Sequence, residues 1–182
     1  MALAQANLMT AEELIKLPRG RHCYELIKGE LLTMTPAGAE HGAITVKLTC
    51  QLGIYVDNNN LGLVFAAETG FRLQHDPDTV LAPDLAFVCR GRILTLPTGY
   101  LDLPPDLVVE VLSPSERDLK VEKKTALWLE LGVRQVWLVK PKSKTIEVRS
   151  SDGRRKLFTV DGELVDNEVI VGFRMPVSKI FT

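Results

Sequence analysis

Two apolar runs in the middle of the chain constrain the fold more than any other feature. Residues 80–88 read VLAPDLAFV and residues 106–112 read DLVVEVL. Each run has the length of one strand, and so few polar residues are typical of central strands in a sheet. Both faces of such strands must be shielded from water by other elements. The pattern therefore predicts an α/β fold with a central mixed β-sheet flanked by helices.

Helix and strand signals surround these two runs. A T-x-x-E capping box at Thr10 and Glu13 predicts a short helix that ends before Pro18. A longer helix is expected over 41–56, and a third runs to Leu131. The apolar stripe of the second helix consists of Ile44, Leu48, Leu52 and Tyr55. Further strands are expected at 23–27, 30–34, 63–67, 69–73, 134–139, 145–149, 156–160 and 169–173.

The 182 residues contain no repeat, low-complexity tract or flexible linker, which favours a single domain over residues 1–182. Within it, 1–20 form an N-terminal helical extension and 161–182 form peripheral C-terminal strands. With 46% hydrophobic residues, most of the chain is not disordered. No run approaches the roughly 18 apolar residues of a membrane span, and the start lacks a basic signal region. We therefore expect a cytoplasmic protein without a membrane partner.

The cysteine pattern and the charge distribution bear on whether the protein has disulfides, binds zinc or binds nucleic acid. Cys23, Cys50 and Cys89 have no C-x-x-C spacing, so neither a disulfide framework nor a zinc site is expected. The net charge is −1, but residues 117–156 hold twelve Lys/Arg and five Asp/Glu. These basic residues either track a phosphate backbone or form an ordinary solvated face. The basic residues near the end of this segment are Lys140, Lys142, Lys144, Arg149, Arg154, Arg155 and Lys156.

An acidic residue lies in the interior of each apolar run: Asp84 in the first and Glu110 in the second. A carboxylate removed from water needs a cation or a metal ion nearby. Either acid alone could be a strand-end residue paired with an arginine. Two of them in consecutive central strands favour a shared metal site.

A lysine on the third helix supplies a matching positive charge. At 100° per residue, Lys124 falls on the inward apolar stripe with Val121 and Trp128, whereas Lys123 points away. Its ammonium either meets the acids of the preceding strand or snorkels to the rim. Two carboxylates that hold Mg²⁺ and a lysine beside them are suited to phosphodiester hydrolysis.

Several motifs together resemble the Uma family of putative restriction endonucleases, which is placed in the PD-(D/E)XK nuclease superfamily. They are YELIKGELLTMTPAGAEHG (24–42), APD (82–84), VEVLSPS (109–115) and LGVRQVWLVKP (131–141). The match covers nearly the whole chain. The resemblance implies a restriction-endonuclease-like core, with additional peripheral β-hairpins.

The resemblance also implies roles for single residues. Asp84 corresponds to the PD aspartate and Glu110 to the (D/E) acid, and both would hold the metal. The superfamily lysine stands two residues after the acid, where this chain has Leu112. Families of this kind carry the lysine on the following helix, which nominates Lys124, with Lys120 and Lys123 as alternatives.

Two further residues match positions of the family. His41 corresponds to a histidine at the start of the long helix, and either assists catalysis or is a core or helix-start residue. Glu25 corresponds to an acidic position, and is either an additional ligand for metal or water or an edge-strand acid.

These expectations describe an Mg²⁺-dependent endonuclease, with Mn²⁺ as a substitute, that acts on nucleic acid, with DNA favoured, as a homodimer. Its catalytic residues would be Asp84, Glu110, Lys124 and His41. The alternative is a catalytically inactive protein of the same fold that binds nucleic acid or another protein. A third possibility is a nuclease subunit that needs a second chain.

Overall fold

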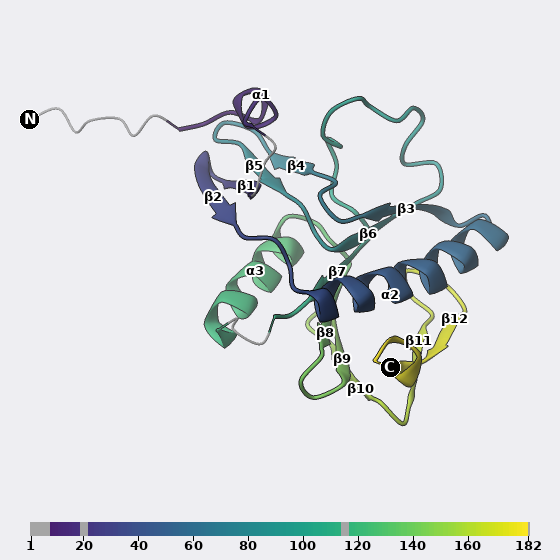
Figure 1. Ribbon diagram of the computed structural model, residues 1–182. Helices are drawn as coiled ribbons and strands as arrows, with labels where there is room; N and C mark the ends of the chain where they lie inside the picture. Colours follow the sequence, from purple (N-terminus) through teal and green to yellow (C-terminus); the bar gives the residue numbers. More distant parts are fainter. Residues whose placement is uncertain (1–7, 19–21, 114–116, 182) are drawn as a thin grey trace, which may run out of the picture.

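A six-stranded sheet runs through the centre of the protein, as the computed structural model in Figure 1 shows. The structure describes residues 8–18, 22–113 and 117–181. Strand order is β10-β9-β8-β7-β6-β3, and only β7 and β8 are parallel. The strands span β3 Gly62–Ala66, β6 Leu85–Cys89, β7 Leu107–Val111, β8 Gln135–Lys140, β9 Thr145–Ser150 and β10 Arg155–Thr159. This is the central mixed sheet that the sequence predicts.

Two smaller antiparallel sheets accompany the central one. The first has the order β2-β1-β5-β4, and the second is the hairpin β11-β12. Their strands span β1 Cys23–Ile27, β2 Glu30–Met34, β4 Phe71–Gln74, β5 Thr79–Leu81, β11 Glu163–Asp166 and β12 Phe173–Pro176. The helices are α1 Ala11–Leu14, α2 Ala39–Asn58, α3 Asp118–Glu130 and the 3₁₀ helix η1 Val177–Ile180.

Helix α2 covers one face of the central sheet (Figure 1). Its buried residues recur at four-residue steps, as an amphipathic helix on a sheet requires. They are Ile44, Leu48, Leu52 and Val56, which pack against inward residues of β6, β7, β8 and β9. Tyr55, expected on this stripe, is only partly buried, because the four-residue steps bring Val56 to the sheet instead.

Helix α3 covers the opposite face, where Trp128 packs on Val108, Val136 and Leu138. Leu81 of the small sheet joins the same cluster. Both a helix and a second sheet therefore pack on this face of the central sheet. Val109 and Val111 point into the α2 core. Because side chains alternate along a strand, Glu110 between them points toward α3.

The C-terminal segment completes the core on the α2 side. The residues Leu164, Ile170, Phe173, Met175, Val177 and Ile180 are buried there. The described residues 161–181, which the sequence predicts as peripheral strands, thus add these buried apolar side chains to this core. The strand expected at 169–173 is wrong. The Asp166 carboxylate accepts hydrogen bonds from the backbone N–H groups of Glu168, Val169 and Ile170, which holds this stretch in a turn.

The apolar run 80–88 is two strands rather than one. Strand β5 pairs within the small sheet and ends at Leu81, and β6 begins at Leu85 in the central sheet. Pro83 lies between them, and a proline has no N–H to continue a ladder of hydrogen bonds. The segment Ala82-Pro83-Asp84 therefore carries the chain from one sheet to the other.

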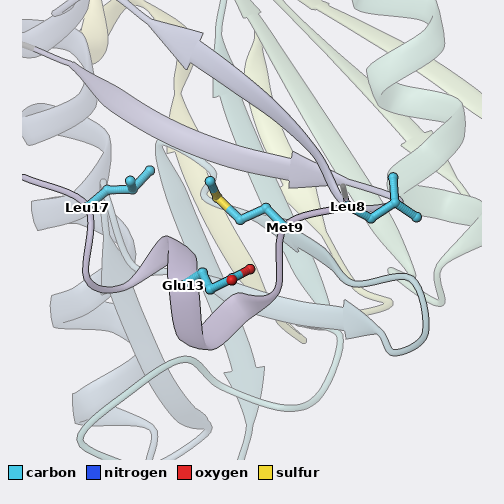
Figure 2. A pocket seen from close by; sticks show the side chains of 4 residues that line it. All are labelled: Leu8, Met9, Glu13 and Leu17. Carbon is cyan, nitrogen blue, oxygen red and sulfur yellow. The ribbon is translucent and has the colours of Figure 1, made fainter. Parts of the chain in front are cut away.

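The N-terminal helix α1 has the capping box expected at Thr10 and Glu13. Next to it, Leu8, Met9, Glu13 and Leu17 line a shallow hollow, and Figure 2 shows their side chains around it. No residue of the expected site lines this hollow. Residues 1–7 and 19–20 of the expected N-terminal extension lie outside the described residues. None of the described helices is long and apolar enough to cross a membrane.

Candidate active site

The two acids of the apolar runs lie opposite each other across β6 and β7. Leu85, the first residue of β6, pairs with Val109 of β7, so Asp84 directly before β6 lies near Glu110 directly after Val109. The Val111 N–H donates a 2.7 Å hydrogen bond to Asp84 Oδ2, which ties the aspartate to the end of β7. The two carboxylates lie close enough for the negative charge of Asp84 to act on Glu110, so they form the centre of one candidate site.

Lys124 of α3 reaches this site from above the sheet. Its Nζ lies 3.0 Å from Glu110 Oε1 and 3.2 Å from Glu25 Oε1. Burial works to lower the pKa of Lys124, but the two carboxylates outweigh it and raise the pKa above its ordinary value. Lys124 is therefore a fixed positive charge rather than a snorkelling side chain. Lys120 and Lys123, the alternatives from the sequence, are exposed.

The environment of Glu110 disfavours its charged form. Burial raises the pKa of Glu110 to about 7; Lys124 opposes the shift, whereas the negative charges of Asp84 and Glu25 add to it. The side chain also accepts a 2.8 Å hydrogen bond at Oε1 from the indole N–H of Trp128. Leu112, which occupies the usual lysine position of the superfamily, packs in the apolar cluster on the α3 face.

His41 lies in the first turn of α2 and contacts the other acid. Its Nε2 is 2.8 Å from Asp84 Oδ1, and both side chains are about four-fifths buried, with 18% and 19% exposed. Among the described residues, each oxygen of Asp84 has one hydrogen-bond partner: the imidazole at Oδ1 and the backbone of β7 at Oδ2. His41 thus contributes to the same site and holds the orientation of Asp84.

Glu25 comes from the small sheet and joins the site from a second direction. Its Oε1 accepts a 3.0 Å hydrogen bond from the Ala82 N–H as well as the contact with Lys124. The side chain is 3% exposed, so Glu25 is a buried acid of β1 rather than an exposed edge residue. It connects the segment that carries Asp84 with the helix that carries Lys124.

Sequence reasoning did not assign Trp128 to the site. The helical projection identifies it as an inward apolar residue, which is correct but incomplete. The available signal was its position four residues after Lys124, because residues at i and i+4 lie on the same face of a helix.

The chain is similar to known proteins over nearly its whole length. A family model, Uma2, described as "Putative restriction endonuclease", matches residues 11–178. The chain belongs to the Uma2 family. Its motifs and its site residues lie within the matched range. No curated protein matches the chain.

A solved structure has the same fold as this Uma2 chain. It is the crystal structure described as a putative nuclease belonging to DUF820 from Anabaena variabilis. The two chains are 22% identical and superpose with a TM-score of 0.78, covering 95% of this chain and 97% of the other. The likeness shows that the two chains share this fold, a central mixed sheet flanked by helices, which is the fold class that the sequence predicts.

The donor chemistry of this Uma2 site fits a hard divalent cation. Asp84 and Glu110 offer carboxylate oxygens. Burial, with a further contribution from the negative charges of Asp84 and Glu25, raises the pKa of Glu110, and a cation would offset both effects. Among the described residues, no group of three or more His, Cys, Asp or Glu side chains could hold a metal ion. Mg²⁺ needs only one or two carboxylates when waters and phosphate oxygens complete its shell.

The basic residues expected to track phosphates are largely neutralised. Five of the seven pair with acids: Lys140 with Glu147, Arg149 with Glu122 and Glu147, Arg154 with Asp152 and Glu168, Arg155 with Glu122, and Lys156 with Glu168. This arrangement favours the solvated-face interpretation for most of this surface.

Proposed function

We propose that this protein is an Mg²⁺-dependent endonuclease that hydrolyses phosphodiester bonds of DNA. The observation that carries the proposal is the convergence of Lys124, Glu110 and Asp84 on one partly buried site, between α3 and the central sheet. A buried lysine and two carboxylates from different elements are costly to assemble without a function. Membership of a family described as restriction endonucleases supports the same reaction class.

Asp84 and Glu110 would hold the metal ion. When bound, Mg²⁺ supplies Lewis acidity toward the phosphodiester and a lowered pKa for coordinated water. Despite burial, the carboxylates of Glu110 and Glu25 raise the pKa of Lys124 and favour its charged ammonium form. Its role is to neutralise the charge that develops on the phosphate in the transition state. His41 keeps Asp84 oriented through its hydrogen bond to Oδ1.

The test is cleavage of supercoiled plasmid, single-stranded DNA and RNA in Mg²⁺ or Mn²⁺. We expect Glu110→Gln and Lys124→Ala to lower the plasmid cleavage rate at least about 100-fold, as removal of a transition-state charge or a metal ligand does. Lys123→Ala is the matched control, because that exposed lysine is the chain neighbour of Lys124. It should cleave at the wild-type rate.

Equal plasmid cleavage rates for wild type, Glu110→Gln and Lys124→Ala would contradict the proposal. That result would favour a catalytically inactive protein of the nuclease fold. Faster cleavage of RNA than of either DNA would keep the hydrolytic mechanism and replace the substrate.

A further inference from the structure

The indole of Trp128 contacts the candidate site although the side chain belongs to the apolar core. It is fully buried between α3 and the central sheet, and its Nε1 donates to Glu110 Oε1 at 2.8 Å. Lys124, one helical turn earlier, donates to the same oxygen at 3.0 Å. Two donors on one face of α3 therefore meet a single carboxylate oxygen.

This pairing leaves the two oxygens of Glu110 in different states. Oε1 is occupied by the ammonium and the indole, whereas Oε2 accepts no hydrogen bond from any residue that the structure describes. A carboxylate with one oxygen held by two donors cannot rotate without breaking both contacts. Its second oxygen is thereby kept in one place and available.

We propose that Trp128 is a positioning residue that holds the Glu110 carboxylate with Oε2 directed to the metal ion. The inference rests on the proposed function, since it assumes that Glu110 is a metal ligand. Residues that orient a ligand in this way commonly change metal affinity 10- to 100-fold when they are replaced.

A purely structural role for the indole is the competing explanation, because buried tryptophans usually find some acceptor for their N–H. The chain contains its own comparison. Trp137 is equally buried, and its Nε1 donates to Gln135 Oε1 at 3.1 Å on the other face of the sheet. The two tryptophans therefore differ in the acceptor and not in burial.

The experiment is a calorimetric Mn²⁺ titration at pH 8 of wild type, Trp128→Phe, Trp137→Phe and Glu110→Gln. Phenylalanine keeps the aromatic ring and removes the N–H donor. We expect Trp128→Phe to weaken Mn²⁺ binding about 10-fold or more. We expect Trp137→Phe to bind like wild type and Glu110→Gln to lose most of its affinity. Thermal unfolding of both phenylalanine variants checks that they are folded and similarly destabilised.

The outcomes separate the two proposals. Mn²⁺ binding that Trp128→Phe leaves unchanged, while Glu110→Gln abolishes it, overturns the role of Trp128 and retains the metal site. Binding that is equal in wild type and Glu110→Gln, or absent from both, overturns the metal site and the inference with it.

A measurement on the wild-type protein covers the case in which Trp128→Phe does not fold. The two indole N–H resonances can be followed by NMR during addition of Mg²⁺. The Trp128 resonance should shift on binding and in Glu110→Gln, and the Trp137 resonance should stay. A Trp128 resonance that does not move at saturating Mg²⁺ would overturn the inference.

Discussion

At the scale of single residues, Glu110 is the group whose protonation matters most. Its pKa of about 7 lies well above the ordinary 4.5, with burial as the main cause. Because the folded value is raised, the metal-free protein loses stability from this group as the pH rises from about 4.5 to about 7. Under the proposed function, a cation bound to Glu110 would offset this penalty, and metal and proton would compete for the same carboxylate.

This competition predicts a pH dependence of metal binding. The affinity for Mn²⁺ should be constant above about pH 7 and should fall as the pH is lowered further. The decrease approaches tenfold per pH unit, because only the ionised carboxylate is a ligand. Calorimetric titrations at pH 8, 7 and 6 measure it. An affinity independent of pH over this range would mean that Glu110 is not a ligand.

The residues of the site could be predicted from sequence to different degrees. Asp84, Glu110 and Lys124 stand out because a charge within an apolar run or stripe is visible in the sequence. The contact of Trp128 with Glu110 is not visible, since an indole on an apolar stripe has the same pattern whatever its N–H binds. The contact of Glu25 with Lys124 depends on how two sheets pack, which no local pattern encodes.

At the scale of elements, helix α3 is held on both flanks by charged contacts. On one flank Lys124 binds Glu110 and Glu25; on the other, Glu122 forms two 2.6 Å hydrogen bonds with Arg149 of β9. Arg149 is 7% exposed and also contacts Glu147 at 2.7 Å. The orientation of α3, and with it the reach of Lys124, depends on both flanks.

We therefore expect Arg149→Met to destabilise the protein by about 1.5–3 kcal/mol, the range for hydrogen bonds to charged groups. It should also lower nuclease activity, because α3 loses its contact with β9. Arg154→Met is the control, since that arginine is half-exposed and its ion pairs lie at the surface. Urea unfolding compares the two variants, and equal stability for both would show that the contact on this flank is dispensable.

Most elements follow from periodicity, and the exceptions have local causes. The four-residue steps in α2 and the apolar runs of β6 and β7 are strong signals. The break at Ala82-Pro83-Asp84 has no hydropathy signature, and Pro83 was its only indication. The turn at 169–173 depends on the Asp166 side chain, which competes for backbone N–H groups that a strand would use.

At the scale of the whole molecule, the core on the α2 face contains residues from an early segment of the chain and from its C-terminal segment. Helix α2 lies near the start of the chain, and η1 near its end contacts it (Figure 1). The stability of the central sheet therefore depends on residues far from the candidate site.

A neighbouring pair tests this dependence. Ile170 is fully buried and Val171 is 61% exposed. We expect Ile170→Ala to cost about 2–5 kcal/mol and Val171→Ala to change stability by less than about 0.5 kcal/mol, both measured by urea unfolding. Similar values for both would contradict the assignment of this segment to the core. The Mn²⁺ affinity of each folded variant should equal that of wild type.

The crossing of the chain from the small sheet to the central sheet at residues 82–84 has a consequence for biosynthesis. The site draws on β1, α2, β7 and α3 as well as on this crossing, and so on residues from Glu25 to Lys124. A chain that has been synthesised beyond Lys124 but is not yet folded contains all of these side chains but not the site. Under the proposed function, hydrolysis would therefore begin only when folding has brought both sheets and both helices together.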